Sequence, residues 1–179
     1  RWVLVRLVRH DDDPHAITTS ELIFELTNDT TSPLHEGVDL TGELPDVALK
    51  QGSLAPEIKQ IISSKHSPLR DREFDAQYEC LRRYISAIRD LDRDGWKNTT
   101  TPFYKARVMR ALLRILPDIV QEIKKDAEKV TVGEYGKYLG RIEAKSLADE
   151  KIKAVQGSAG IKQITQTIQD QIFPKKVGK

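Results

Sequence analysis

The chain has 179 residues and a net charge of +2, and 39% of its residues are hydrophobic and 31% charged. This length fits one domain that buries a core without a metal or a disulfide, and a single cysteine excludes an intrachain disulfide. No apolar run approaches the ~20 residues that a membrane-spanning helix needs, so we expect no membrane segment.

Residues 1–27 form an apolar N-terminal segment, which we predict to be strand-like. Trp2 to Val8 is rich in β-branched and apolar residues, as strands are. The stretch from Thr19 to Asn28 has apolar Leu22, Ile23, Phe24 and Leu26 after a possible cap at Thr19 or Ser20, and it fits either a second strand or one short helix.

The sequence HDDDPH, His10 to His15, groups two imidazoles with three carboxylates. Such ligands suit magnesium, manganese or zinc. However, no second His/Asp motif follows at helical spacing, and the glycine and distal glutamate of a calcium loop are missing. We interpret the motif as an acidic turn before a proline and predict no metal site, with a metal-dependent hydrolase as the remote alternative.

Residues 28–53 are rich in Thr, Pro, Gly and acidic side chains, with scattered apolar residues. This composition is typical of a long acidic linker. We expect it to be poorly ordered or to lie over the surface of the domain.

Helical periodicity begins after Gly52, and we predict a helical bundle over residues 54–173, followed by a basic tail, 174–179. Ser67 and Pro68 are favourable as the N-cap and first residue of a helix, which we expect to end at Gly95. The apolar stripe of this helix comprises Phe74, Tyr78, Leu81, Ile85 and Ile88. A last stripe comprises Ile161, Ile164, Ile168 and Ile172.

Between these stripes, Thr101 and Pro102 predict the start of a helix that is kinked or divided at Pro117. At about 100° per residue, one arc of it holds Val108, Leu112, Ile115, Leu116, Ile119 and Ile123. We expect this arc to be core, so that Leu112→Ala costs ~2–5 kcal/mol. Arg110 lies on the opposite side, where Arg110→Ala should cost under about 0.5 kcal/mol.

The stretch from Val130 to Ile142 contains Gly133 and Gly136 in a G-x-x-G pattern before an amphipathic segment. It is similar to the core of a KH domain, a resemblance that implies a clamp on a nucleic-acid backbone. Thr131 and Glu134 also have the spacing of a capping box. We therefore favour a capped helix whose glycines allow close helix packing.

The charges are distributed unevenly: residues 1–58 have a net charge of −7, and residues 59–125 one of +6. Arginine forks bind phosphates and carboxylates bidentately. The candidate contacts for nucleic acid or an acidic partner are Arg107, Arg110 and Arg114, with Lys105, Arg82 and Arg83 as auxiliaries. A solvated face is the other interpretation, and acidic residues 28–57 of the same chain could mask the arginines.

The sequence has no G-x-S-x-G, Walker-type or dinucleotide-binding motif, and we interpret Cys80 as a packed residue. We therefore predict neither catalytic residues nor a cofactor. The expected fold is mainly α: a helical bundle with a short strand-like N-terminal segment and a long acidic linker.

The expected function is that of a non-catalytic interaction module of a larger protein, binding a protein partner through amphipathic helices. The alternative is a nucleic-acid-binding domain that uses the arginine face, which comprises Arg107, Arg110 and Arg114. One cysteine fits a reducing compartment, so we expect an intracellular location, cytoplasmic or nuclear. The first residue, Arg1, suggests a piece of a longer chain.

Overall fold

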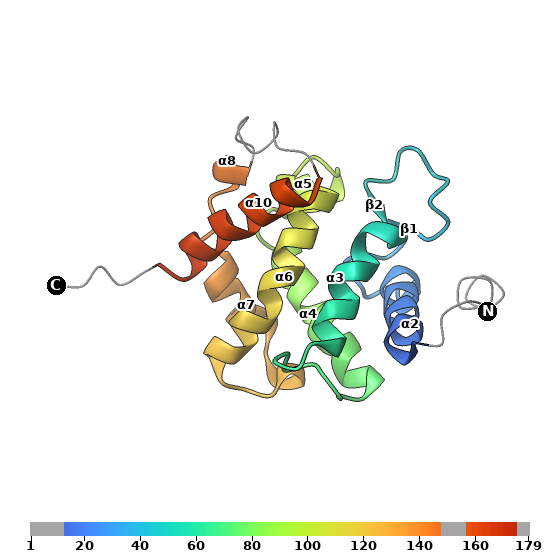
Figure 1. The fold of residues 1–179 in the computed structure, drawn as a ribbon. Helices are drawn as coiled ribbons and strands as arrows, with labels where there is room; N and C mark the ends of the chain where they lie inside the picture. The colour runs from blue at the N-terminus through green and yellow to red at the C-terminus, as the bar shows by residue number, and fades with distance from the viewer. Residues whose placement is uncertain (1–12, 148–156, 175–179) are drawn as a thin grey trace.

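The computed structural model describes residues 13–147 and 157–174, and over these ranges the chain forms a helical bundle with one very short parallel β-pair (Figure 1). The α-helices are α2 (Pro14–Asn28), α3 (Gln51–Ser63), α4 (Phe74–Arg89), α5 (Arg93–Lys97), α6 (Ala106–Ile123), α7 (Val132–Leu139), α8 (Ala144–Leu147) and α10 (Gly157–Ile172). The strands are β1 (Val38–Asp39) and β2 (Leu49–Lys50), and the 3₁₀ helices are η1 (Pro102–Tyr104) and η2 (Ala127–Lys129). The prediction of a mainly α-helical fold is confirmed.

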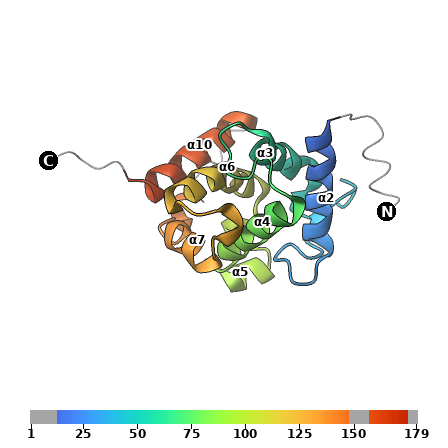
Figure 2. The same ribbon diagram turned by 90° about the horizontal axis from the view of Figure 1, so that it is seen from below.

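Helix α6 is central to the packing: α10 crosses it and α3 lies beside it (Figure 1). On the other side of α3, α2 packs against α3 and α4, and α4 lies between α2 and α7 (Figure 2). This arrangement buries α6 on more than one side, so its fully covered residues include Met109, Leu113 and Val120.

The predicted apolar stripes are confirmed as core. On α6 the buried members are Val108, Leu112, Ile115, Leu116 and Ile119, with Ile123 partly buried at the edge. On α4 the stripe is fully buried from Leu81 onward, and on α10 all four isoleucines are buried. Helix α6 also continues through Pro117 as one helix, so it is not divided there.

The stretch from Thr19 to Asn28 is helical and forms the larger part of α2, so the strand interpretation of this stretch is wrong. The Asp13 carboxylate caps the helix by accepting from the backbone N–H of His15 (2.9 Å), and Pro14 follows at the first position. Leu22 and Leu26 are buried against the neighbouring helices, so the bundle includes residues 14–28 and does not begin at residue 54. The predicted strand at Trp2 to Val8 lies outside the described residues.

The segment predicted as an acidic linker, residues 28–53, contributes to the core through Leu34, Val38 and Leu49. Val38 pairs with Leu49 in the β1–β2 ladder. Trp96 Nε1 donates a hydrogen bond to a backbone carbonyl of the segment, that of Pro33, over 3.1 Å. Isolated apolar residues give no periodic signal in the sequence, but side chains from α5 and η1 fix the segment in place; only the β1–β2 loop extends away from the bundle (Figure 1).

The predicted boundaries around α4 are wrong. The helix begins at Phe74, because Leu69 is buried and its carbonyl accepts from Gln77 Nε2 (3.1 Å), which holds the preceding residues in turns. Ser67 caps only a local turn, where its hydroxyl accepts from the N–H of Leu69. Gly95 does not end this helix; it lies inside α5, where its N–H donates to Asp92 (2.9 Å).

The region that resembles a KH core is the capped helix α7. Thr131 and Glu134 form a reciprocal capping box, and Gly133 and Gly136 lie within the helix, so they form no loop. A Cβ atom at Gly133 or Gly136 would meet no other group within 4 Å. The expectation that these two glycines allow close helix packing is therefore wrong.

None of the helices in the described ranges combines the length and the apolar character needed to cross a lipid bilayer.

Candidate functional site

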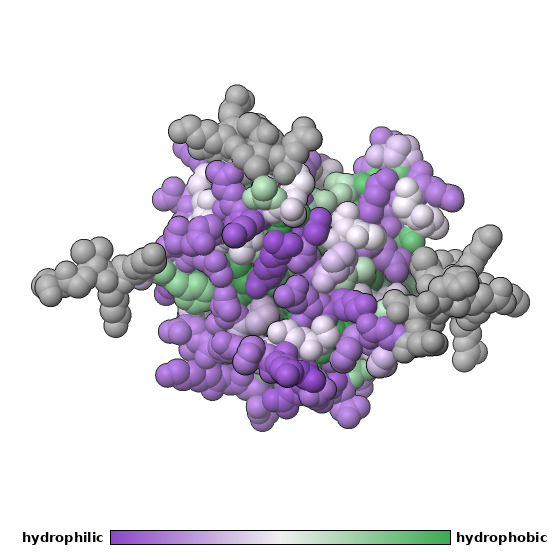
Figure 3. Space-filling view, viewed as in Figure 1, coloured by the Kyte–Doolittle hydropathy of each residue, from purple (hydrophilic) through white to green (hydrophobic). Residues whose placement is uncertain are grey.

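A polar groove of about 600 Å³ lies between α3, α6 and α10, beside the turn that follows α3. Its lining residues from α6 lie in the second half of that helix. Figure 1 shows α3 beside α6 and α10 crossing it. Figure 3 shows this face of the molecule, where hydrophilic side chains surround small hydrophobic patches. The groove is lined by Glu57, Gln60, Ile61, Ser64, His66, Ser67, Arg114, Pro117, Asp118, Gln121, Thr165 and Gln169.

One wall of the groove is built on a carboxylate shared by two arginines. Glu57 of α3 is 3% exposed, and Arg110 and Arg114 of α6 are 26% and 34% exposed. Arg114 binds bidentately, with Nε 2.7 Å from Oε2 and Nη2 2.9 Å from Oε1. Arg110 donates from Nε to Oε1 over 2.9 Å. Two of the three main arginine candidates are therefore joined, and the acid that masks them belongs to the predicted acidic region.

This pairing changes the electrostatics of the arginine face. Burial by itself would raise the pKa of Glu57, but the hydrogen bonds and charges of Arg114 and Arg110 outweigh it and lower the pKa. The sequence alone predicts a small loss for Arg110→Ala; because Arg110 donates a hydrogen bond to a buried carboxylate, we expect instead a loss of about 1–3 kcal/mol.

Neutral hydrogen-bonding side chains form most of the remaining lining. Gln121 Nε2 donates to the carbonyl of His66 (2.7 Å), which ties the turn to α6. Gln169 Nε2 donates to Asp118 Oδ2 (3.0 Å), which ties α10 to α6. These bonds connect α6 to the turn on one side of the groove and to α10 on the other.

The other predicted contact residues lie elsewhere. Lys105 precedes α6, where its Nζ donates to the carbonyl of Thr99 (3.3 Å) in an exposed position. Arg107, at the start of α6, also takes part in a polar interaction, but it does not line the groove.

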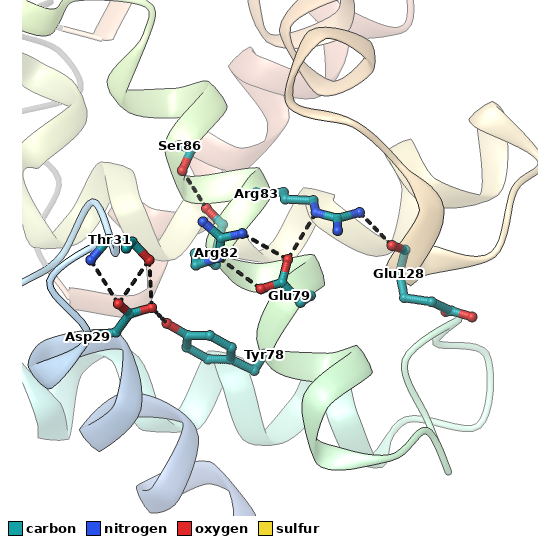
Figure 4. Close-up of polar contacts among 8 residues, drawn as sticks. All are labelled: Asp29, Thr31, Tyr78, Glu79, Arg82, Arg83, Ser86 and Glu128. Carbon is teal, nitrogen blue, oxygen red and sulfur yellow. Dashed lines mark hydrogen bonds and ion pairs between the residues drawn. The ribbon is translucent and has the colours of Figure 1, made fainter.

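Arg82 and Arg83 are paired with Glu79 one turn away on α4 (Figure 4). Arg83 Nη1 also donates to the carbonyl of Glu128 (2.6 Å) in η2. The structure therefore does not join these two arginines to the α6 pair; their contacts connect α4 with η2.

Figure 4 also shows Asp29, at the end of α2, accepting hydrogen bonds from Tyr78 of α4 and from Thr31. The hydrogen bond from Tyr78, followed by those from Thr31, lowers the pKa of Asp29. Burial and the same hydrogen bond raise the pKa of Tyr78. The network fixes α2 on α4, and we assign it a structural role.

Cys80 is buried, with its Sγ 3.1 Å from the hydroxyl of Tyr135. Burial raises the pKa of the thiol to about 12, against the smaller effect of the Tyr135 hydrogen bond. Since the thiolate is the reactive form, we expect Cys80 to react with a disulfide reagent at pH 8 at least ~100 times more slowly in the native protein than in urea. Absorbance during thiol titration measures this directly, because the chain has one cysteine. Equal rates would contradict the burial.

Part of the HDDDPH motif lies outside the described residues, which begin at Asp13. Asp13 serves as the cap of α2 and as the partner of Lys59 Nζ (2.8 Å). Within residues 13–147 and 157–174, no three His, Cys, Asp or Glu side chains are placed to hold a metal ion.

We compared the chain with protein-family models, curated proteins and solved structures, and none of them matches. The groove must therefore be interpreted from its own chemistry.

The sequence does not by itself indicate Glu57, Asp118 or the amide side chains as residues of a site. A signal was present for Glu57, which is spaced between Leu54 and Ile61 on the apolar stripe of α3. An acid in such a stripe implies a buried cationic partner. The amides gave no such signal, because glutamine is common on exposed helix faces.

Proposed function

We propose that the chain is a non-catalytic helical interaction module that binds an extended segment of a protein partner in the groove between α3, α6 and α10. This proposal rests on the chemical character of the side chains that line the groove. Six neutral hydrogen-bonding side chains surround the groove, and these are Gln60, Ser64, Ser67, Gln121, Thr165 and Gln169.

An extended peptide has one N–H and one C=O per residue to satisfy. Amide and hydroxyl side chains both donate and accept, so they match such a backbone without requiring one particular side chain. Binding sites in helical proteins also lie preferentially between the helices of a bundle. A groove lined in this way suits a polar peptide better than an apolar small molecule.

The nucleic-acid alternative has less support. Binding to a polyanion depends on cationic side chains that replace counterions. Arg110 and Arg114 share Glu57, Arg82 and Arg83 share Glu79, and Asp118 adds a negative charge to the groove. These acids reduce the positive potential that the arginines would otherwise present.

The proposal is tested by selecting randomised nine-residue peptides displayed on phage against the protein, then measuring the affinities of the recovered peptides by fluorescence polarisation. Thr165→Tyr should obstruct the groove and weaken binding at least ~10-fold. Among the residues that the structure describes, its hydroxyl bonds within α10, to the carbonyl of Ile161, so we expect the fold to be retained, as judged by circular dichroism. Gln163→Tyr, on the exposed side of the same helix, is the matched control and should bind like the parent.

Duplex DNA and single-stranded RNA are titrated in parallel at two salt concentrations. Recovery of no binding peptides, or equal affinity of the Thr165→Tyr variant, would contradict the groove. Nucleic-acid binding with a steep salt dependence would favour the alternative.

A further inference from the structure

The groove contains two opposite charges on the same helix, Arg114 and Asp118, one turn apart on α6. Each charge has a different partner: Arg114 pairs with Glu57 of α3, and Asp118 accepts from Gln169 of α10. They are therefore held apart, and both line the space that a ligand would occupy.

Arg114 retains hydrogen-bonding capacity towards a ligand. Its bonds to Glu57 use Nε and Nη2, and its Nη1 has no bond to any other residue in the described ranges. Because Glu57 is shared with Arg110, the group of three has one positive charge in excess. A carboxylate in the groove would meet both an open guanidinium edge and a net positive charge.

Asp118 provides the complementary feature. It is exposed, and the bond from Gln169 occupies one position on one of its two oxygens. A carboxylate has about four lone-pair sites, and the described contacts place no cation on this one. A lysine or arginine of a ligand would therefore find an acid that has no ion-pair partner among the described residues.

The positions of Arg114 and Asp118 on α6 restrict how far apart the charged residues of a ligand can be in its sequence. Side chains at i and i+4 on a helix have Cβ atoms about 5–6 Å apart. Side chains two residues apart in an extended chain lie on one face and are separated by about 6.6 Å along it. Residues one apart point to opposite faces, so they cannot both meet this surface.

We propose that the groove recognises an extended protein segment with an acidic and a basic side chain two residues apart, the acid on Arg114 and the base on Asp118. The inference rests on the proposed function, since it specifies the ligand of the same groove. Either chain direction satisfies it, because only the spacing and the opposite signs matter.

The test uses four phage libraries of nine-residue peptides, with Glu-x-Lys, Glu-Lys-x, Glu-x-Glu or Lys-x-Lys fixed at the centre and the other positions random. Glu-x-Lys and Glu-Lys-x have the same fixed composition and differ only in spacing. We expect the protein to enrich Glu-x-Lys over Glu-Lys-x by about two- to fivefold, since Glu-Lys-x can make one of the two exposed charge contacts but not both, and each contact contributes a few-fold. The preference should shrink in 0.5 M salt.

Substitutions at position 118 identify the source of the preference. Asp118→Asn keeps an acceptor for Gln169 and should remove the preference for the lysine, while Asp118→Lys should shift enrichment to Glu-x-Glu. Asp170→Lys is the matched control, because Asp170 is also exposed on a helix and accepts from a glutamine amide, Gln166 Nε2 (2.9 Å), but lies outside the groove. It should enrich the same peptides as the parent.

Enrichment of peptides through the groove without preference for Glu-x-Lys would overturn this inference and leave the proposed function intact. A preference that survives Asp118→Lys would overturn it as well. Failure of all four libraries to yield binders would overturn both.

Discussion

Leu112→Ala should destabilise the protein by about 2–5 kcal/mol, the range for buried leucines whose removal leaves a cavity. Leu112 is fully buried on α6, the helix that packs against α3 and α10. Its carbonyl accepts a hydrogen bond from Tyr84 of α4 (2.7 Å), and alanine retains that carbonyl. The expected loss therefore comes from packing and not from the hydrogen bond, and urea denaturation at pH 7 measures it.

Leu44→Ala is the matched control, because the same atoms are removed from a side chain that is 53% exposed on the β1–β2 loop. We expect a change under about 0.5 kcal/mol. Similar losses for the two variants would show that the region around α6 adjusts to fill the space, contrary to the packing described.

The parts of the fold that could be predicted are those with a sustained period. The isoleucines of α10 and the arc of α6 repeat at helical spacing, and both are core. The 28–53 region could not be predicted, because Leu34, Val38 and Leu49 are isolated in the sequence and its position also depends on bonds with distant elements. Bonds such as that from Tyr104 to the carbonyl of Gly37 span 67 positions, and no local pattern encodes them.

The candidate site was predictable in part for the same reason. The arginines of α6 are recognisable as a charged side of an amphipathic helix, and the sequence raised the idea that acids of residues 28–57 mask them. It could not identify Glu57 as the acid, because the contact depends on how α3 lies beside α6. The groove itself requires three helices at once, and α10 is separated from α3 by about half of the chain.

Glu57→Gln should lower the free energy of unfolding at pH 7 by about 2–3 kcal/mol. Removing one member of a buried ion pair leaves the other charge without compensation, at a cost of about 3–5 kcal/mol when burial is complete. Arg110 and Arg114 are each about a quarter to a third exposed, so water offsets part of this cost. The double variant Arg110→Gln/Arg114→Gln should lose more, about 3–5 kcal/mol, because it leaves a carboxylate that is only 3% exposed.

Glu79→Gln is the matched control for Glu57→Gln. Glu79 also pairs with two arginines, but its side chain is 32% exposed and both partners lie on its own helix. Exposed pairs of this kind contribute about 1 kcal/mol or less. Equal losses at the two positions in urea denaturation would indicate that burial and the connection between helices are not what makes the Glu57 group stabilising.

The pH dependence separates the charge of Glu57 from its shape. Because the arginines lower the pKa of Glu57 in the folded state, its ionisation stabilises the protein above its unfolded pKa of about 4.5, and this contribution is lost as the pH falls through the lowered folded value. Other carboxylates behave similarly: the hydrogen bond from Lys125, together with those from Thr131, lowers the pKa of Glu134 to about 2.

The informative quantity is therefore the difference in the free energy of unfolding between the parent and Glu57→Gln at each pH. That difference should be constant from pH 7 to about 5 and should shrink below about pH 4.5, first as Glu57 takes up a proton in the unfolded parent and then as it does so in the folded parent. A difference that stays constant down to pH 3 would mean that the variant loses stability through packing and that the arginines do not stabilise the charge of Glu57.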